Sequence, residues 1–128
     1  MSKSKRNDRA RYAMWKKGRF ACIEAKEEGF FATPVIKFKG CHLKLNVKTS
    51  KTGNVRVEVI GIKSWIHKKK VEELIPGRSF EDSNPIEGDH LSHIVTWKGD
   101  PDLGHAEDQP IYLRFKLRSA KLYAFEFE

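Results

Sequence analysis

Residues 111–127 read IYLRFKLRSAKLYAFEF, and this stretch decides the predicted fold. From Ile111 to Arg118, apolar side chains alternate with tyrosine or cationic ones, which is the period of two typical of a half-buried strand. Residues 119–120 interrupt the pattern, and residues 122–127 alternate again with their aromatic side chains on one face. We therefore expect a tight antiparallel hairpin with an aromatic inner face.

The same alternation occurs upstream of this hairpin. Residues 42–49 place Leu43, Leu45 and Val47 on one face, and residues 55–59 repeat the pattern with three valines. Residues 50–53, Ser-Lys-Thr-Gly, have the composition of a hairpin turn, so we expect these two segments to pair. Shorter strand signals lie at residues 19–25, 29–33, 35–39 and 91–98, whereas residues 61–77, 81–90 and 99–110 are expected to be mostly loop.

Strands that alternate apolar-in and polar-out are typical of antiparallel sheets with one solvated face. We therefore predict an all-β, two-sheet antiparallel β-sandwich of the jelly-roll or concanavalin-like type, over residues 18–128. A flexible basic tail, residues 1–17, is expected to precede it. The cysteines, Cys22 and Cys41, are expected to be buried free thiols, but a disulfide between them stays open.

The formal net charge of +8 belongs mainly to the N-terminus. Residues 1–20 hold eight basic side chains and one acidic one, while the rest of the chain holds 17 and 16. A nucleic-acid partner is therefore not favoured for the domain itself. No apolar run approaches the ~20 residues of a membrane helix, and no signal peptide is recognisable, so we expect a soluble protein of unassigned location.

Motifs of catalysis and metal binding are missing from the sequence. The closest histidines, His90 and His93, would point to opposite faces of a strand, so no metal or cofactor is expected. The two acidic loops, residues 81–90 and 99–110, would lie at opposite ends of strand 91–98, about 20 Å apart. This separation disfavours a glycosidase-like carboxylate pair.

Four residues are candidates for ligand binding: Trp65, Trp97, Asp82 and Asp89. Flat indole rings stack on sugar rings, and Trp65, in a lysine-rich segment, is the best candidate for exposure. Trp97 lies near a strand end, where packing is the favoured role. The two aspartates offer oxygen ligands, although turn capping and ion pairs are the favoured use.

The C-terminal half also carries a family resemblance. Its segments are PGRSFED at residues 76–82, VTWKG at 95–99 and PIYLRFKLRSAKLYAF at 110–125. The pattern resembles the C-terminal β-sandwich of glycosidase-like proteins with a five-bladed propeller, related to invertase-type, glycoside hydrolase family 32-like enzymes. The resemblance implies that the catalytic carboxylates belong to the propeller, so none is carried over here. Residues 61–75 look longer and more basic than the corresponding turn of that family.

The expected function is a non-catalytic accessory module of such a protein, acting in packing, oligomerisation or weak carbohydrate binding. Its expected partners are a carbohydrate, a second copy of the chain or a propeller domain. One alternative is polyanion or nucleic-acid binding through the basic tail and Lys68–Lys70. Another, less favoured, is a stand-alone glycosidase that uses loop carboxylates.

Overall fold

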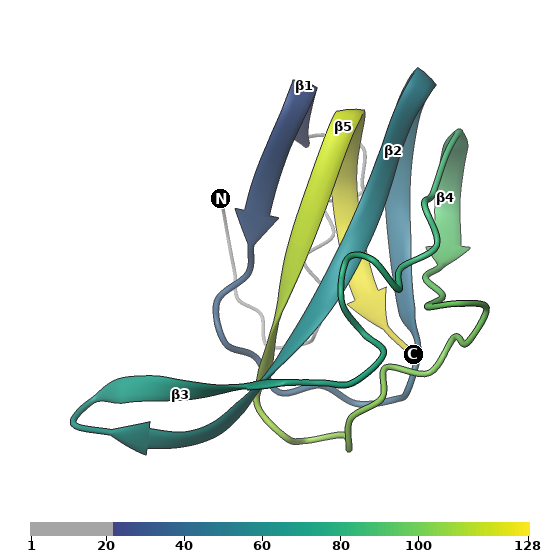
Figure 1. The fold of residues 1–128 in the computed structure, drawn as a ribbon. Helices are drawn as coiled ribbons and strands as arrows, with labels where there is room; N and C mark the ends of the chain where they lie inside the picture. Colours follow the sequence, from purple (N-terminus) through teal and green to yellow (C-terminus); the bar gives the residue numbers. More distant parts are fainter. Residues whose placement is uncertain (1–21) are drawn as a thin grey trace.

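The computed structural model describes residues 22–128, and these residues form five strands and no helix (Figure 1). The strands are β1 (Ile23–Ala32), β2 (Leu43–Ile66), β3 (Lys69–Leu74), β4 (Asp89–Ile94) and β5 (Ile111–Phe127). They are ordered β1-β5-β2-β3, with β4 on β2, and all pairs are antiparallel. The prediction of an all-β antiparallel fold is confirmed. The predicted tail and residues 18–21 lie outside the described residues.

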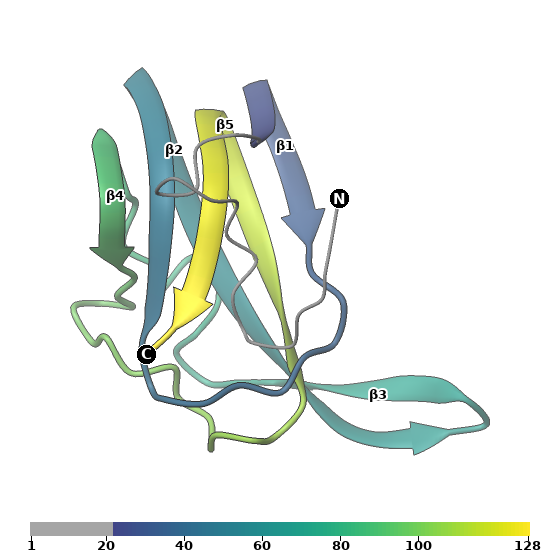
Figure 2. The same cartoon turned by 180° about the vertical axis from the view of Figure 1, so that it is seen from behind.

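β2 and β5 form one long antiparallel ladder that bends midway. Residues 43–49 pair with residues 120–127, and residues 54–61 pair with residues 111–118. Neither strand pairs with itself, so the two hairpins predicted from the sequence are wrong. Figures 1 and 2 show β2 and β5 each as two limbs that meet at one end of the molecule, one limb in front of the other.

Residues 50–53, which look like a hairpin turn in the sequence, form a bend instead. They do so because β2 and β5 are irregular at positions that lie opposite each other. The register shifts between Thr49 and Asn54, opposite Ser119, whose φ is 46°. At Gly53, a Cβ atom would lie 2.4 Å from the carbonyl oxygens of both Arg118 and Ser119. Only a residue without a side chain allows the two backbones to approach this closely.

The core lies on the inside of the bend. Its strand residues occupy mainly alternate positions, because one face of each strand points inward. From β2 and β5 they are Leu43, Leu45, Val47, Val55, Val57, Val59, Ile111, Leu113, Phe115, Leu117, Ala120, Leu122 and Phe125. Hydrogen bonds join all five strands into one sheet. The finer arrangement, two stacked sheets of a sandwich or jelly roll, stays a prediction.

The segment after β3 covers the edge of β2 that β5 does not use. Val55 and Ile86 exchange backbone hydrogen bonds, and β4 pairs with residues 44–48 further along the edge. The indole N–H of Trp97 donates to the carbonyl oxygen of Val57 at 3.0 Å. This segment is therefore ordered largely by the backbone of β2, although much of it has a loop-like sequence.

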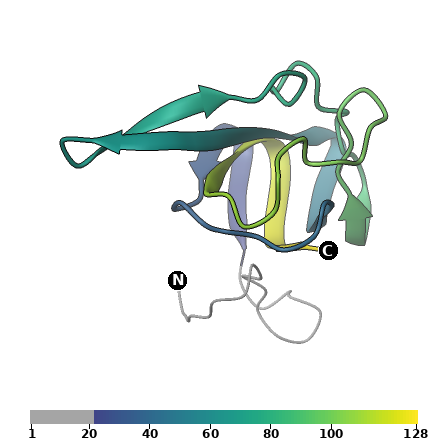
Figure 3. The same cartoon turned by 90° about the horizontal axis from the view of Figure 1, so that it is seen from below.

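The end of β2 and β3 form a two-stranded arm that extends beyond the rest of the sheet (Figure 3). Residues 60–66 pair with residues 69–74 across the turn His67-Lys68. The prediction that residues 61–77 are mostly loop is therefore wrong. A register shift between Ile62 and Ser64 breaks the apolar alternation, which hid the strand in the sequence. We call residues 63–74 the arm.

Both cysteines are free thiols. Cys22 and Cys41 are also exposed, so the expectation that they pack as buried apolar side chains is wrong. Cys22 lies just before β1, and Cys41 lies in the connection to β2, outside the alternating segments that point inward. Within residues 22–128, we find no helix with the length and hydropathy of a membrane span.

Candidate functional site

The four residues predicted to bind a ligand lie in three separate places. Trp65 is near the tip of the arm, Asp89 begins β4, and Trp97 and Asp82 lie in the segment that covers β2. Trp97 is only 1% exposed, so its ring offers no face to a sugar. The structure therefore does not bring these four side chains into one site.

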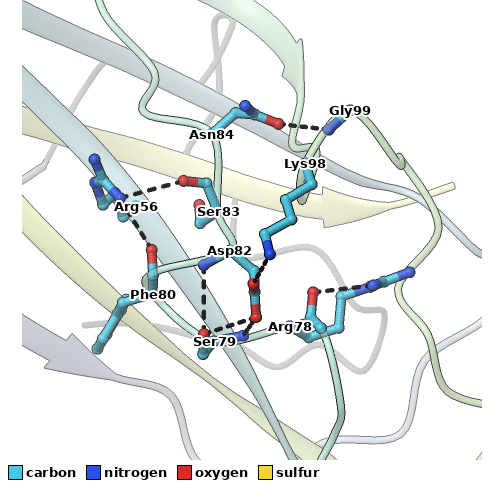
Figure 4. Close-up of polar contacts among 10 residues, drawn as sticks. Arg56, Arg78, Ser79, Phe80, Asp82, Ser83, Asn84, Lys98 and Gly99 are labelled. Atoms are coloured by element: carbon cyan, nitrogen blue, oxygen red, sulfur yellow. Dashed lines mark hydrogen bonds and ion pairs between the residues drawn. The ribbon is translucent and has the colours of Figure 1, made fainter.

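Asp82 is held by its own turn (Figure 4). Its carboxylate accepts a hydrogen bond from the Ser79 hydroxyl at 2.8 Å, and the ammonium group of Lys98 lies 3.2 Å away. The hydrogen bonds from Ser79 and Lys98 lower the pKa of Asp82 below its ordinary value. This carboxylate is therefore an ionised cap of the turn, as the sequence favoured.

A second carboxylate, that of Asp100, is fixed by Arg78. The guanidinium Nη2 of Arg78 lies 2.8 Å from Asp100 Oδ2, and its Nε donates to the carbonyl oxygen of Asp102. The same guanidinium lies 5.4 Å from the ring centre of Trp97. The backbone N–H of Asp102, and then Arg78, lower the pKa of Asp100. Arg78 thus joins the segment before Asp82 to the loop of residues 99–110 and to the buried Trp97.

These contacts bring the two acidic loops together, so the predicted separation of the loops is wrong. The backbone N–H of Lys98 donates to the carbonyl oxygen of Asp82 at 2.8 Å, because the chain turns back after β4. Asp82 and Asp100 each have their own cation and a lowered pKa. A general acid for glycoside hydrolysis needs a raised pKa, and the pKa shifts of Asp82 and Asp100 run in the other direction.

His90 and His93 lie side by side on β4. A register shift opposite Leu45 and Val47 adds one residue to β4, and the ring centres are 4.6 Å apart. The prediction that they face opposite sides is therefore wrong. Burial and then the charge of His90 lower the pKa of His93. Among residues 22–128, no group of three His, Cys, Asp or Glu side chains is placed to hold a metal ion.

The arm presents large apolar side chains to solvent. Leu74 is 76% exposed, Trp65 58% and Ile66 55%. Trp65 lies opposite Lys70 and shares a face with Leu74, whereas Ile66 lies on the other face. Sequence reasoning found Trp65 but missed the two aliphatic residues, because their exposure follows from pairing across the turn.

The tip of the arm is strongly basic. Residues 63–70 contain four lysines and no aspartate or glutamate. The turn residues His67 and Lys68 have φ values of 51° and 66°, as the central residues of a two-residue type I′ hairpin require. Neither is a glycine, so the turn is strained by about 1 kcal/mol or more.

The base of the arm is attached to the body through Tyr112. The Tyr112 hydroxyl donates to Glu72 Oε2 at 2.7 Å, and the ammonium group of Lys70 lies 4.5 Å from the Tyr112 ring centre. Burial, followed by the hydrogen bond to Glu72, raises the pKa of Tyr112 to about 12. Ile60 and Ile62 pack beside this ring. The arm therefore has a fixed base and a solvated tip.

Comparisons of the chain with protein-family models, with curated proteins and with solved structures give no significant match. The family resemblance in the sequence therefore stays a prediction.

Proposed function

We propose that the chain is a non-catalytic accessory module that docks on another protein domain through the arm. The observation that carries the proposal is the exposure of Trp65, Ile66 and Leu74, three of the four most exposed large apolar side chains in residues 22–128. Exposed apolar side chains concentrated in one segment usually mark interaction surfaces, and aromatic anchors tend to dominate their binding energy.

The aliphatic residues favour a protein partner over a carbohydrate. A sugar would stack on Trp65 but would gain little from Ile66 or Leu74. Burial of each of these side chains in an apolar pocket contributes about 1.5–3 kcal/mol. Residues 63–70, which include Trp65 and Ile66, also contain four lysines. The partner is therefore expected to offer an apolar cleft with an acidic rim.

The sequence resemblance supplies the class of partner. On this proposal the bent sheet is the small jelly-roll-like sandwich of a glycosidase-like protein, and the five-bladed propeller is the domain that receives the arm. The state of the loop carboxylates supports a non-catalytic role, because Asp82 and Asp100 are each engaged by a cation and by turn hydrogen bonds.

The test is binding of the full chain to the propeller protein encoded nearest to its gene, measured by titration calorimetry. The double variant W65A/L74A removes two anchors and is expected to weaken binding at least about 100-fold. Leu91→Ala is the matched control, because Leu91 is 51% exposed but lies on β4. It should change the affinity less than about twofold.

Three outcomes would contradict docking on a propeller. The first is no binding, or equal weakening by both variants. The second is a dimer of the wild-type chain, seen by sedimentation, that W65A/L74A dissociates, since the arm would then bind a second copy. The third is binding to neutral glycans on an array that is lost with Trp65→Ala, since the arm would then be a sugar platform.

A further inference from the structure

A second surface lies on the outer side of the bent sheet, on the face opposite to the core. Phe30 of β1 pairs with Lys116 of β5, which in turn pairs with Arg56 of β2. Cross-strand partners share a face, so these three side chains form a row across the sheet. Arg114 and Arg118 occupy the equivalent β5 positions in the two neighbouring rows. We call this surface the outer face.

Two aromatic rings lie on the outer face. Phe30 is 62% exposed, and its ring centre is 6.0 Å from that of Phe80. The ammonium group of Lys116 lies 5.9 Å from the Phe30 ring centre, and the guanidinium of Arg114 lies 5.6 Å from that of Phe80. Arg56 donates to the carbonyl oxygen of Phe80 at 3.2 Å, which positions this residue (Figure 4). Rings and cations therefore alternate over the surface.

Cations outnumber carboxylates on the outer face. The three rows contain Arg56, Arg114, Lys116 and Arg118 against Glu28 and Glu58. Glu28 lies 3.8 Å from Lys116, and Glu58 lies 3.0 Å from Arg114. The four cations of these rows therefore exceed the carboxylates by two charges, an excess that the sequence alone did not predict.

We propose that the outer face binds single-stranded nucleic acid, with bases stacked on Phe30 and Phe80 and phosphates beside Arg114, Lys116 and Arg118. Aromatic platforms flanked by cations are the usual means of binding single strands, because every base offers a flat face. A duplex or an acidic peptide would satisfy the cations but would leave the exposed Phe30 ring without a stacking partner. This inference goes beyond docking through the arm, and it uses residues outside the arm.

The test is fluorescence anisotropy of a labelled oligothymidylate of about 12 nucleotides, within the site sizes of known single-strand binders, titrated with the full chain. Phe30→Ala is expected to weaken binding roughly 5- to 100-fold, the range seen for loss of one stacked base. K116Q/R118Q should reduce the slope of log affinity against log salt by about 1.4, for two lost phosphate contacts.

Two controls separate the outer face from general charge attraction. K68Q/K69Q removes two positive charges from the arm, as many as K116Q/R118Q removes from the outer face. The affinity of K68Q/K69Q for the oligonucleotide should be several-fold higher than that of K116Q/R118Q. Leu91→Ala truncates another exposed apolar side chain and should bind as the wild type does. Since Phe30 is 62% exposed, the Phe30→Ala variant is expected to stay folded, which circular dichroism checks.

The inference is overturned if the wild-type chain does not bind the oligonucleotide at about 50 mM salt, where phosphate contacts are strongest. Equal affinity for a duplex of the same length, or wild-type affinity of Phe30→Ala, overturns it as well. So does an equal loss in K68Q/K69Q and K116Q/R118Q, which would assign the binding to the whole chain's charge. The arm variant W65A/L74A should bind the oligonucleotide normally, so the two proposals fail independently.

Discussion

The body of the sheet and the arm share strand β2, yet they differ in where their apolar side chains lie. In the body, Phe115 is fully buried between the rings of Phe31 and Phe125, with centres 6.0 and 5.7 Å away. In the arm, Trp65 and Leu74 are more than half exposed. The inner face of the body buries its apolar side chains, whereas the arm leaves large apolar side chains in contact with solvent.

This difference separates residues that stabilise the fold from residues that are available for binding. A side chain on the inside of the bend meets the opposite limb of the same chain, so its burial stabilises the monomer. The arm extends past that limb as a single layer (Figure 3), and its residues 63–74 are all exposed except Val71, which is half-buried. Substitutions on the inside of the body should therefore lower the stability of the fold. Substitutions in the arm should weaken binding and leave the stability nearly unchanged.

The largest effect is expected when an aromatic residue is truncated in each region. Phe115→Ala should lower the free energy of unfolding by about 3–5 kcal/mol, because it leaves a cavity in the core. Trp65→Ala should change it by less than about 0.5 kcal/mol, because the ring is already in water. Urea unfolding followed by circular dichroism measures both. Equal destabilisation by the two variants would mean that the arm packs as part of the body.

The bend itself is tested by adding one methyl group. Gly53→Ala places a Cβ atom 2.4 Å from two carbonyl oxygens of β5, and backbone atoms have little room to move. We expect a loss of about 1–3 kcal/mol in unfolding free energy. Gly61→Ala on the same strand is the control, since its nearest neighbour, His105, lies at 3.4 Å. If both variants are equally stable, the two bends do not lie against each other as described.

The same bend shows how far the sequence predicts the fold. Alternation correctly identified residues 43–49, 55–59 and 111–117 as strands. It also identified which side chains of these strands point to the core. It did not identify their partners, because Ser-Lys-Thr-Gly at 50–53 has the composition of a turn whether the chain reverses or only bends. The choice depends on the close contact of Gly53 with β5, which is distant in sequence.

Prediction of the candidate site succeeded for local features and failed for those that depend on pairing. An exposed Trp65 and a capping role for Asp82 were favoured from neighbouring residues alone. Leu74 and Phe30 were missed as surface residues, because exposure of an apolar side chain depends on which strand lies over it. His90 and His93 were placed on opposite faces, because one extra residue in β4 has no signature in the sequence.

A smaller effect is expected at the joint between the two regions. Tyr112→Phe removes the hydrogen bond to Glu72 and should lower the unfolding free energy by about 1 kcal/mol at neutral pH. The pKa of Tyr112 is raised to about 12, above the ordinary value of about 10 for an unfolded chain. The fold therefore favours the protonated phenol, and this stabilisation is complete below pH 10 and lost as the pH rises toward 12.

Urea unfolding at pH 8 and at pH 11 tests whether the stabilisation by Tyr112 decreases as the pH rises. The stability difference between the wild type and Tyr112→Phe should be smaller at the higher pH. A difference that stays constant or grows would show that the phenol proton does not hold the arm.

The smallest effect on the whole molecule is expected at the tip of the arm. Lys68 has a φ of 66°, a left-handed conformation that glycine adopts without steric cost. Lys68→Gly should therefore stabilise the arm locally by about 0.5–1 kcal/mol, because the relief of strain exceeds the added entropy of the unfolded chain. The expected result is about two- to fivefold slower amide exchange in residues 63–74, with global unfolding unchanged.

Lys70→Gly is the control, since a glycine within β3 should speed the exchange of the same amides. Slower exchange throughout the body in Lys68→Gly would show that arm and body open together, and the comparison between a self-sufficient body and a partner-dependent arm would then fail.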